Sequence, residues 1–101
     1  MLLLVTIGLE QADLAEFDRY ESRVLALLPD HGGRLLWRLR ARDAGSETHL
    51  LEFPSAQALA AFQADPRRAA LASDWARTGA VAKLQEVAPV AAPLPPGVAR
   101  L

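Results

Sequence analysis

Alternating hydrophobic and polar positions predict four β-strands, at residues 2–9, 34–42, 47–53 and 80–87. The first is apolar on both of its faces, which is typical of a central strand covered on two sides. The second alternates most cleanly, with Leu35, Trp37 and Leu39 on one face and four arginines on the other. We therefore expect the apolar face of this second strand to be buried against helices.

Capping residues delimit two helical regions between these strands. Asp13 begins a capping-box pattern that predicts a helix start, and Pro29 ends or kinks that helix. Ser55 predicts the start of the second region, Asp65 followed by proline predicts a restart within it, and Gly79 predicts its end. The order of elements is then β-α-β-β-α-β. This order is the ferredoxin-like arrangement, an α+β fold with a four-stranded antiparallel sheet and helices on one face.

The connection between the second and third strands decides which side chains share a face. We expect a three-residue loop with Gly45 in the left-handed conformation. Such a loop places Trp37 beside Leu51, toward the helices, and turns Arg38 to the opposite face together with Glu52. Arg38 and Glu52 are then expected to contact each other or a symmetry-related copy.

The sheet face opposite the helices is expected to be too apolar to stay uncovered. It would carry four leucines among its charged residues, namely Leu2, Leu4, Leu36 and Leu50. A second copy of the same sheet is the simplest cover, because most soluble oligomers are symmetric homo-oligomers. The sequence therefore predicts a homodimer.

Composition narrows the class of protein. The chain has 101 residues, of which 51% are hydrophobic, with a net charge of −1 and no cysteine. These values argue against a disordered chain, a nucleic-acid-binding protein, a disulfide scaffold and a thiolate metal site. No apolar run reaches the roughly 20 residues that cross a membrane, and no signal peptide is recognisable. We expect a cytoplasmic protein with one domain at residues 1–87 and a Pro-rich tail at residues 88–101.

Several short motifs recur in an order and spacing that resemble a known family. They are Phe17-x-x-Tyr20, His31-Gly32-Gly33-Arg34, Glu52-Phe53-Pro54-Ser55, and Phe62 before Asp65-Pro66-x-Arg68. Together they resemble the dimeric α/β-barrel superfamily, and most nearly its group called domain of unknown function 1330. The resemblance implies a homodimer whose two sheets enclose a shared barrel, with clefts between sheet and helices. It implies no particular reaction, because relatives include cofactor-independent monooxygenases, haem-degrading enzymes, lactone isomerases and binding modules.

Candidate chemistry is sparse. His31 and His49 are the only histidines, so we expect no metal site and no cofactor. Tyr20 and His49 are the candidate catalytic residues, although a buried tyrosine or histidine is more often structural. Arg38, Trp37 and Glu52 are the candidate ligand-binding residues, because arginine can hold a carboxylate in a fork geometry. The alternative for Arg38 and Glu52 is a salt bridge that fixes the dimer register.

Three functions remain open. The first is a homodimeric protein that binds a small organic molecule, which could be anionic, in a sheet–helix cleft. The second is a cofactor-independent enzyme of the monooxygenase or isomerase type. The third is a structural or partner-binding module without a ligand.

Overall fold

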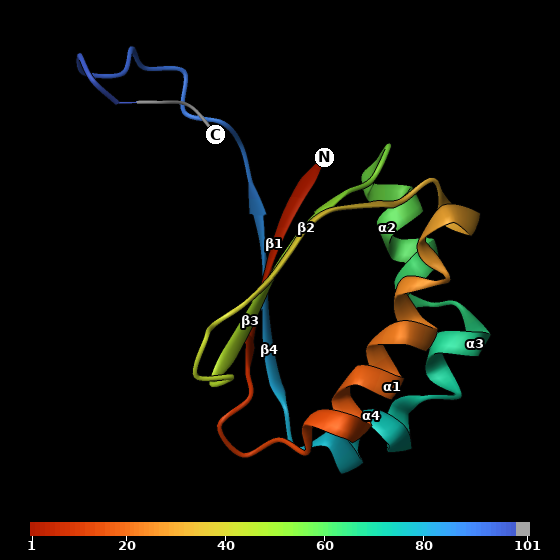
Figure 1. Cartoon of the computed structure of the whole chain (residues 1–101). Coiled ribbons are helices and arrows are strands. Elements are labelled where there is room, and N and C mark those ends of the chain that lie inside the picture. The colour runs from red at the N-terminus through yellow and green to blue at the C-terminus, as the bar shows by residue number, and fades with distance from the viewer. Residues whose placement is uncertain (99–101) are drawn as a thin grey trace.

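Four antiparallel strands form one sheet in the computed structural model of the protein, which describes residues 1–98. The strands are β1 (Leu2–Gly8), β2 (Arg34–Arg40), β3 (Ser46–Glu52) and β4 (Val81–Val87). Their order across the sheet is β2-β3-β1-β4, so the two chain-terminal strands are neighbours. All the helices lie on one face of this sheet (Figure 1). The chain thus has the predicted ferredoxin-like α+β fold.

Three of the helices begin where the capping residues predict. The helices are α1 (Leu14–Leu25), a short 3-10 helix η1 (Leu28–His31), α2 (Ala56–Gln63), α3 (Pro66–Ala69) and α4 (Ala72–Thr78). The Asp13 carboxylate accepts a hydrogen bond from the Glu16 N–H at 3.0 Å, and the Ser55 hydroxyl accepts one from Ala58 at 3.1 Å. Asp65 caps α3 in the same way. The second helical region is divided into three helices rather than two.

Gly79 ends α4 in the left-handed conformation, with a φ of 73°. A Cβ atom there would lie 2.5 Å from the Gln11 carbonyl oxygen. The close approach lets the chain turn from α4 directly into β4, which brings the last strand beside the first.

The hydrophobic core lies between the sheet and α1. Phe17 of α1 and Phe53, which follows β3, are fully buried, and Leu3 and Ile7 of β1 are 1% exposed. These β1 residues share the strand face that points toward the helices, because side chains alternate along a strand. β1 is a central strand, as predicted, because it pairs with β3 on one side and with β4 on the other.

The prediction for the faces of β2 is wrong from Trp37 onward, and a β-bulge is the reason. Leu35 pairs with Leu51, but Trp37 pairs with Leu50, so Leu36 is an extra residue in the ladder. One extra residue reverses the faces of every later residue in the strand. Trp37 and Leu39 therefore lie on the helix-free face, and Arg38 and Arg40 lie on the helix face.

The prediction for the β2–β3 loop is also wrong. The Ala41 N–H donates a hydrogen bond to the Ser46 carbonyl at 3.0 Å, so the loop between the strands has four residues, 42–45. Ala44, with a φ of 59°, takes the left-handed conformation that the prediction gave to Gly45. The Asp43 carboxylate accepts a hydrogen bond from the Gly45 N–H at 2.9 Å and holds the loop in a side-chain turn.

The helix-free face carries an apolar surface. Its exposed members come from both edge strands of the sheet: Trp37 is 46% exposed, Leu39 60% and Val81 69%. Leu2, Leu4 and Leu50 lie between them and are half-buried. Figure 1 shows no other element over this face of the sheet.

The segment that follows β4 extends away from the domain (Figure 1). Residues 88–98 are exposed and form no helix or strand. The last three residues of the predicted tail lie outside the described part of the chain. Within residues 1–98, no helix has the length and hydrophobicity needed to cross a membrane.

Candidate functional site

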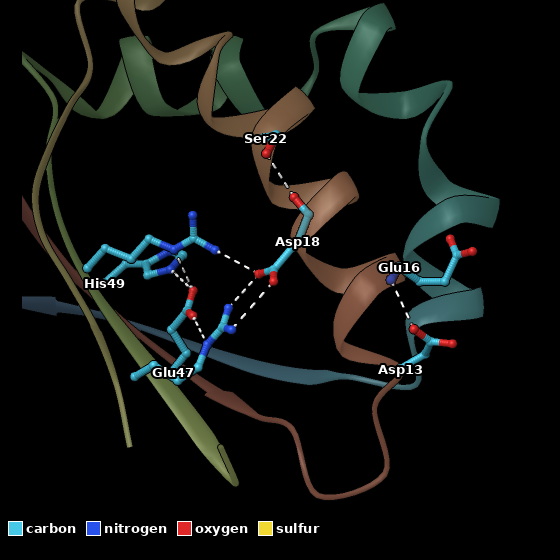
Figure 2. Close-up of polar contacts among 8 residues, drawn as sticks. Asp13, Glu16, Asp18, Ser22, Glu47 and His49 are labelled. Carbon is cyan, nitrogen blue, oxygen red and sulfur yellow. Dashed lines mark hydrogen bonds and ion pairs between the residues drawn. The ribbon is translucent and has the colours of Figure 1, made fainter. Parts of the chain in front are cut away.

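A cluster of charged side chains is built around Glu47 on the helix face of β3 (Figure 2). The Glu47 side chain is 1% exposed. It accepts hydrogen bonds from the Nε atoms of Arg38 at 2.9 Å and Arg40 at 2.8 Å. Both arginines also form ion pairs with Asp18 on α1, at 3.3 Å and 2.5 Å. The cluster joins the sheet edge to α1, and its two carboxylates balance its two guanidinium groups.

The hydrogen bonds of this cluster keep both of its carboxylates ionised. Burial acts to raise the pKa of Glu47, but hydrogen bonds from His49, Arg40 and Arg38 outweigh it and hold the pKa below its ordinary value. The hydrogen bond from Arg40 likewise lowers the pKa of Asp18. A buried ionised carboxylate is stable only with such partners.

The cluster replaces the expected contact between Arg38 and Glu52. Glu52 lies on the helix-free face and pairs instead with Arg34 at 3.5 Å, where both side chains are largely exposed. The predicted Arg38–Glu52 pairing is therefore wrong, because the bulge at Leu36 turns Arg38 to the other side of the sheet.

His49 is held by the same buried carboxylate. Its side chain is 3% exposed, and its Nε2 atom lies 2.5 Å from Glu47 Oε2. Since the carboxylate is ionised, Nε2 carries the proton and donates this hydrogen bond. The other ring nitrogen, Nδ1, is then the one that can accept a hydrogen bond in the neutral ring.

A cavity of about 310 Å³ lies between the sheet and the helices, beside His49. Strands β1, β3 and β4 form its floor, and all four α-helices contribute to its walls. Its lining residues are Val5, Ile7, Tyr20, Glu21, Val24, Leu25, His49, Leu51, Phe62, Gln63, Arg68, Trp75, Ala82 and Leu84. Most are apolar, and three of them are aromatic. The volume is at the lower end of the range of small-molecule sites.

Glu21 is a buried carboxyl group on the wall of this cavity. The residue is 6% exposed, and within residues 1–98 its side chain forms no hydrogen bond or ion pair. Burial raises its pKa from 4.5 to about 7. The group can therefore bind or release a proton near neutral pH.

Arg68 and Tyr20 add two more polar groups to the wall. The Arg68 Nε atom is buried without a hydrogen-bond partner, and the guanidinium lies 5.5 Å from the centre of the Phe62 ring. Tyr20 packs against Trp75 with 5.1 Å between ring centres, and burial raises the pKa of its hydroxyl. The cavity thus combines aromatic walls with groups that donate or accept hydrogen bonds.

The structure brings together only part of the predicted site. Tyr20 and His49 line the cavity, whereas Trp37 and Glu52 lie on the opposite face of the sheet. Arg38 is on the helix face but is held by Glu47 and Asp18.

Glu21 and Arg68 were missed as polar members of the site. For Glu21 a signal was present in the sequence: it stands on the apolar stripe of α1 between Phe17 and Val24, where a charged residue is out of place. The place of Arg68 on the cavity wall depends on tertiary packing, which sequence spacing does not show.

Metal binding finds no support in the described residues. No group of three or more histidine, cysteine, aspartate or glutamate side chains there is arranged to hold a metal ion. His31 lies away from the cavity wall, and its Nε2 atom is 2.8 Å from Asp65 Oδ2. This contact ties η1 to the start of α3.

Comparisons with known proteins identify the fold. No family profile and no curated protein matches the chain. Among solved structures, SnoaB from Streptomyces nogalater, described as a cofactor-independent oxygenase, has a TM-score of 0.67 and 19% identity. That match covers 89% of this chain and 95% of SnoaB.

Two further structures are similar. Protein Atu4242 from Agrobacterium tumefaciens has a TM-score of 0.61 and 17% identity, over 87% of this chain and 94% of its own. A dimeric ferredoxin-like protein of unknown function from Jannaschia sp. CCS1 has a TM-score of 0.56 and 20% identity. That match covers 86% of this chain and 100% of the Jannaschia protein. These likenesses show the ferredoxin-like fold, and the likeness to domain of unknown function 1330 stays a prediction.

Replacing the buried carboxylate should destabilise the protein. Removing one partner of a buried ion pair costs about 3–5 kcal/mol, and because the arginines are one-third exposed we expect Glu47→Gln to cost about 3 kcal/mol. Glu52→Gln is the matched control on the same strand and should cost no more than about 1 kcal/mol. Urea unfolding of both variants measures the difference, and equal losses would contradict the structural role of the cluster.

Glu21 should make stability depend on pH in a recognisable way. Its raised pKa means that the folded state binds the proton more tightly than the unfolded state does. Protonated Glu21 therefore contributes fully to stability below pH 4.5, and this contribution is lost as pH rises through about 7. Glu21→Gln cannot titrate. The free energy of unfolding of this variant minus that of the wild type should therefore rise by about 3 kcal/mol between pH 4 and pH 8. Chemical unfolding across this range measures the difference, and a constant difference would show that Glu21 is not buried.

Proposed function

We propose that the protein binds a small organic molecule in the cavity between its sheet and its helices. The observation that carries this proposal is the cavity itself, which has mostly apolar walls and a few polar groups that converge on it. This combination is the usual character of small-molecule sites, in which apolar contacts supply affinity and polar groups fix orientation.

The aromatic walls favour a ligand with a flat ring. Tyr20 and Trp75 pack together on one side, and Phe62 contacts both Phe53 and the guanidinium of Arg68 on another. Aromatic rings in such walls can stack on a ring of the ligand or meet it edge to face. The polar groups at Glu21, Arg68 and His49 would bind a substituent of that ring.

A homodimer formed through the helix-free face is part of the proposal. The exposed apolar residues Trp37, Leu39 and Val81 support it, because such a surface marks an interaction site. One structural neighbour is described as a dimeric ferredoxin-like protein. Two sheets packed through these faces would give a symmetric pair.

A cofactor-independent enzyme of the monooxygenase or isomerase type is the second candidate. Glu21 favours it, since a carboxyl group with a pKa of about 7 can take a proton from a bound substrate or return one. The likeness to SnoaB in fold is consistent with this candidate but carries no activity to this chain, because one fold supports many reactions.

Ligand binding in the cavity should be visible at one tryptophan and not at the other. Trp75 lines the cavity, whereas Trp37 lies on the far face of the sheet. We expect 2-naphthylmethanol or 2-naphthoate to shift the indole N–H signal of Trp75 in nuclear magnetic resonance spectra, with saturation. Trp75→Phe and Trp37→Phe assign the two signals. A shift confined to Trp37, or no saturable shift with either compound, would overturn the proposed binding site.

The dimer should depend on the apolar helix-free face. Leu39 is 60% exposed, so Leu39→Glu should leave the fold intact while placing a charge in the proposed interface. Light scattering should give a dimer mass for the wild type and a monomer mass for this variant. Val90→Glu, in the segment after β4, is the control and should remain dimeric. A monomeric wild type at micromolar concentration would contradict the proposal.

A further inference from the structure

Two charged side chains on the cavity wall have no oppositely charged partner within residues 1–98. Glu21 of α1 is 6% exposed, and Arg68 of α3 has a buried Nε atom with no hydrogen-bond acceptor. Within residues 1–98, neither side chain takes part in an ion pair. Both side chains line the cavity, so a ligand bound there could contact the Arg68 guanidinium and the Glu21 carboxyl group together.

The charges around Glu21 leave one positive charge uncompensated. The charged groups that act on Glu21 come from four elements: Arg38 on β2, Glu47 on β3, Arg68 on α3 and Asp18 on α1 itself. Arg38 and Arg40 are balanced by Glu47 and Asp18, as described above. If Glu21 is ionised it balances Arg68, and if it is protonated the site carries a net charge of +1.

We propose that the physiological ligand is a carboxylic acid with a ring, that Arg68 binds its carboxylate, and that Glu21 takes up a proton as the ligand enters. This inference rests on the proposed function, because it concerns the same cavity. The ligand's negative charge takes the place of the charge on Glu21. The protonated Glu21 then donates a hydrogen bond to the carboxylate instead of repelling it.

The charges of the groups favour a carboxylate over a phosphate dianion. One guanidinium and one carboxyl proton match a single negative charge, whereas a phosphate dianion would need a second unpaired cation. The Arg68 Nη1 atom already donates to the Gln63 carbonyl at 3.3 Å, and its Nε–H has no acceptor. A planar carboxylate can accept hydrogen bonds from a guanidinium group and from the hydroxyl of a protonated carboxyl group.

Proton uptake fixes the sign of the pH dependence. In the protein without ligand, Glu21 is about half protonated at pH 7, and the negative charge of a bound ligand raises its pKa further. Affinity for a carboxylate should therefore fall about tenfold between pH 6 and pH 8, with uptake of about half a proton at pH 7. A neutral ligand that donates a hydrogen bond to ionised Glu21, such as a phenol, would give the opposite sign. His49 and Tyr20 share the cavity, so the Glu21 variant is needed to assign the effect.

Titration calorimetry with 2-naphthoate tests the inference. Measurements at pH 6, 7 and 8, in two buffers with different heats of ionisation, give both the affinity and the number of protons taken up. We expect Glu21→Gln to bind 2-naphthoate with an affinity independent of pH and with no proton uptake. Arg68→Met should bind it at least about tenfold more weakly, because the charged partner is lost.

Matched controls separate this inference from a general effect on charge or folding. Arg23→Met removes the same charge from an exposed position on α1, outside the cavity, and should bind like the wild type. Thermal unfolding of each variant checks that it is folded. Affinity that rises with pH, or proton uptake that persists in Glu21→Gln, would overturn the inference.

The neutral analogue distinguishes the two proposals. If 2-naphthylmethanol shifts the Trp75 signal and binds as tightly as 2-naphthoate, the cavity is a binding site but the carboxylate preference is wrong. If neither compound shifts the Trp75 signal, the proposed function fails. A preference for 2-naphthoate that is lost in Arg68→Met supports both.

Discussion

The buried carboxylate of Glu47 is the constraint on which the arrangement of the sheet depends. It is 1% exposed and ionised, so it requires positively charged partners at hydrogen-bond distance. Arg38 and Arg40 can reach it only because the bulge at Leu36 turns the second half of β2 toward the helices. The same turn moves Trp37 and Leu39 to the outer face. The apolar character of that face is thus coupled to the charge balance inside the fold.

The Glu47 cluster also borders the cavity, through His49. It holds His49 by one ring nitrogen and is neutral as a whole, so it contributes no net charge to the neighbouring space. Arg68 and Glu21 are then the charged groups of the cavity wall that would interact with a ligand. Asp18 and Glu21 lie three residues apart on α1, one in the cluster and one on the cavity wall. A single helix thereby connects the structural charges with the titratable one.

The similar solved structures share the fold across most of their length, but at 17–20% identity they do not transfer a reaction. A ferredoxin-like sheet with helices on one face leaves space between the two layers wherever the helices are short or broken. Here the helical region between β3 and β4 is divided into α2, α3 and α4, and residues from all three line the cavity. The side chains in that space, rather than the fold, determine what it can bind.

The sequence by itself determined the element order, the helix caps at Asp13, Ser55 and Asp65, and the left-handed end at Gly79, because these depend on local backbone preferences and short-range periodicity. It also pointed to Tyr20 and His49, which do line the cavity. Only the tertiary structure decided the register of β2 and the partners of Arg38. A bulge of one residue reverses every later side chain, and here it brings Arg38 and Arg40 to a carboxylate on another strand. The pattern of residues along one strand does not show which distant charges pair. The faces of the second half of β2, and with them the members of the site, are therefore visible only in the tertiary structure.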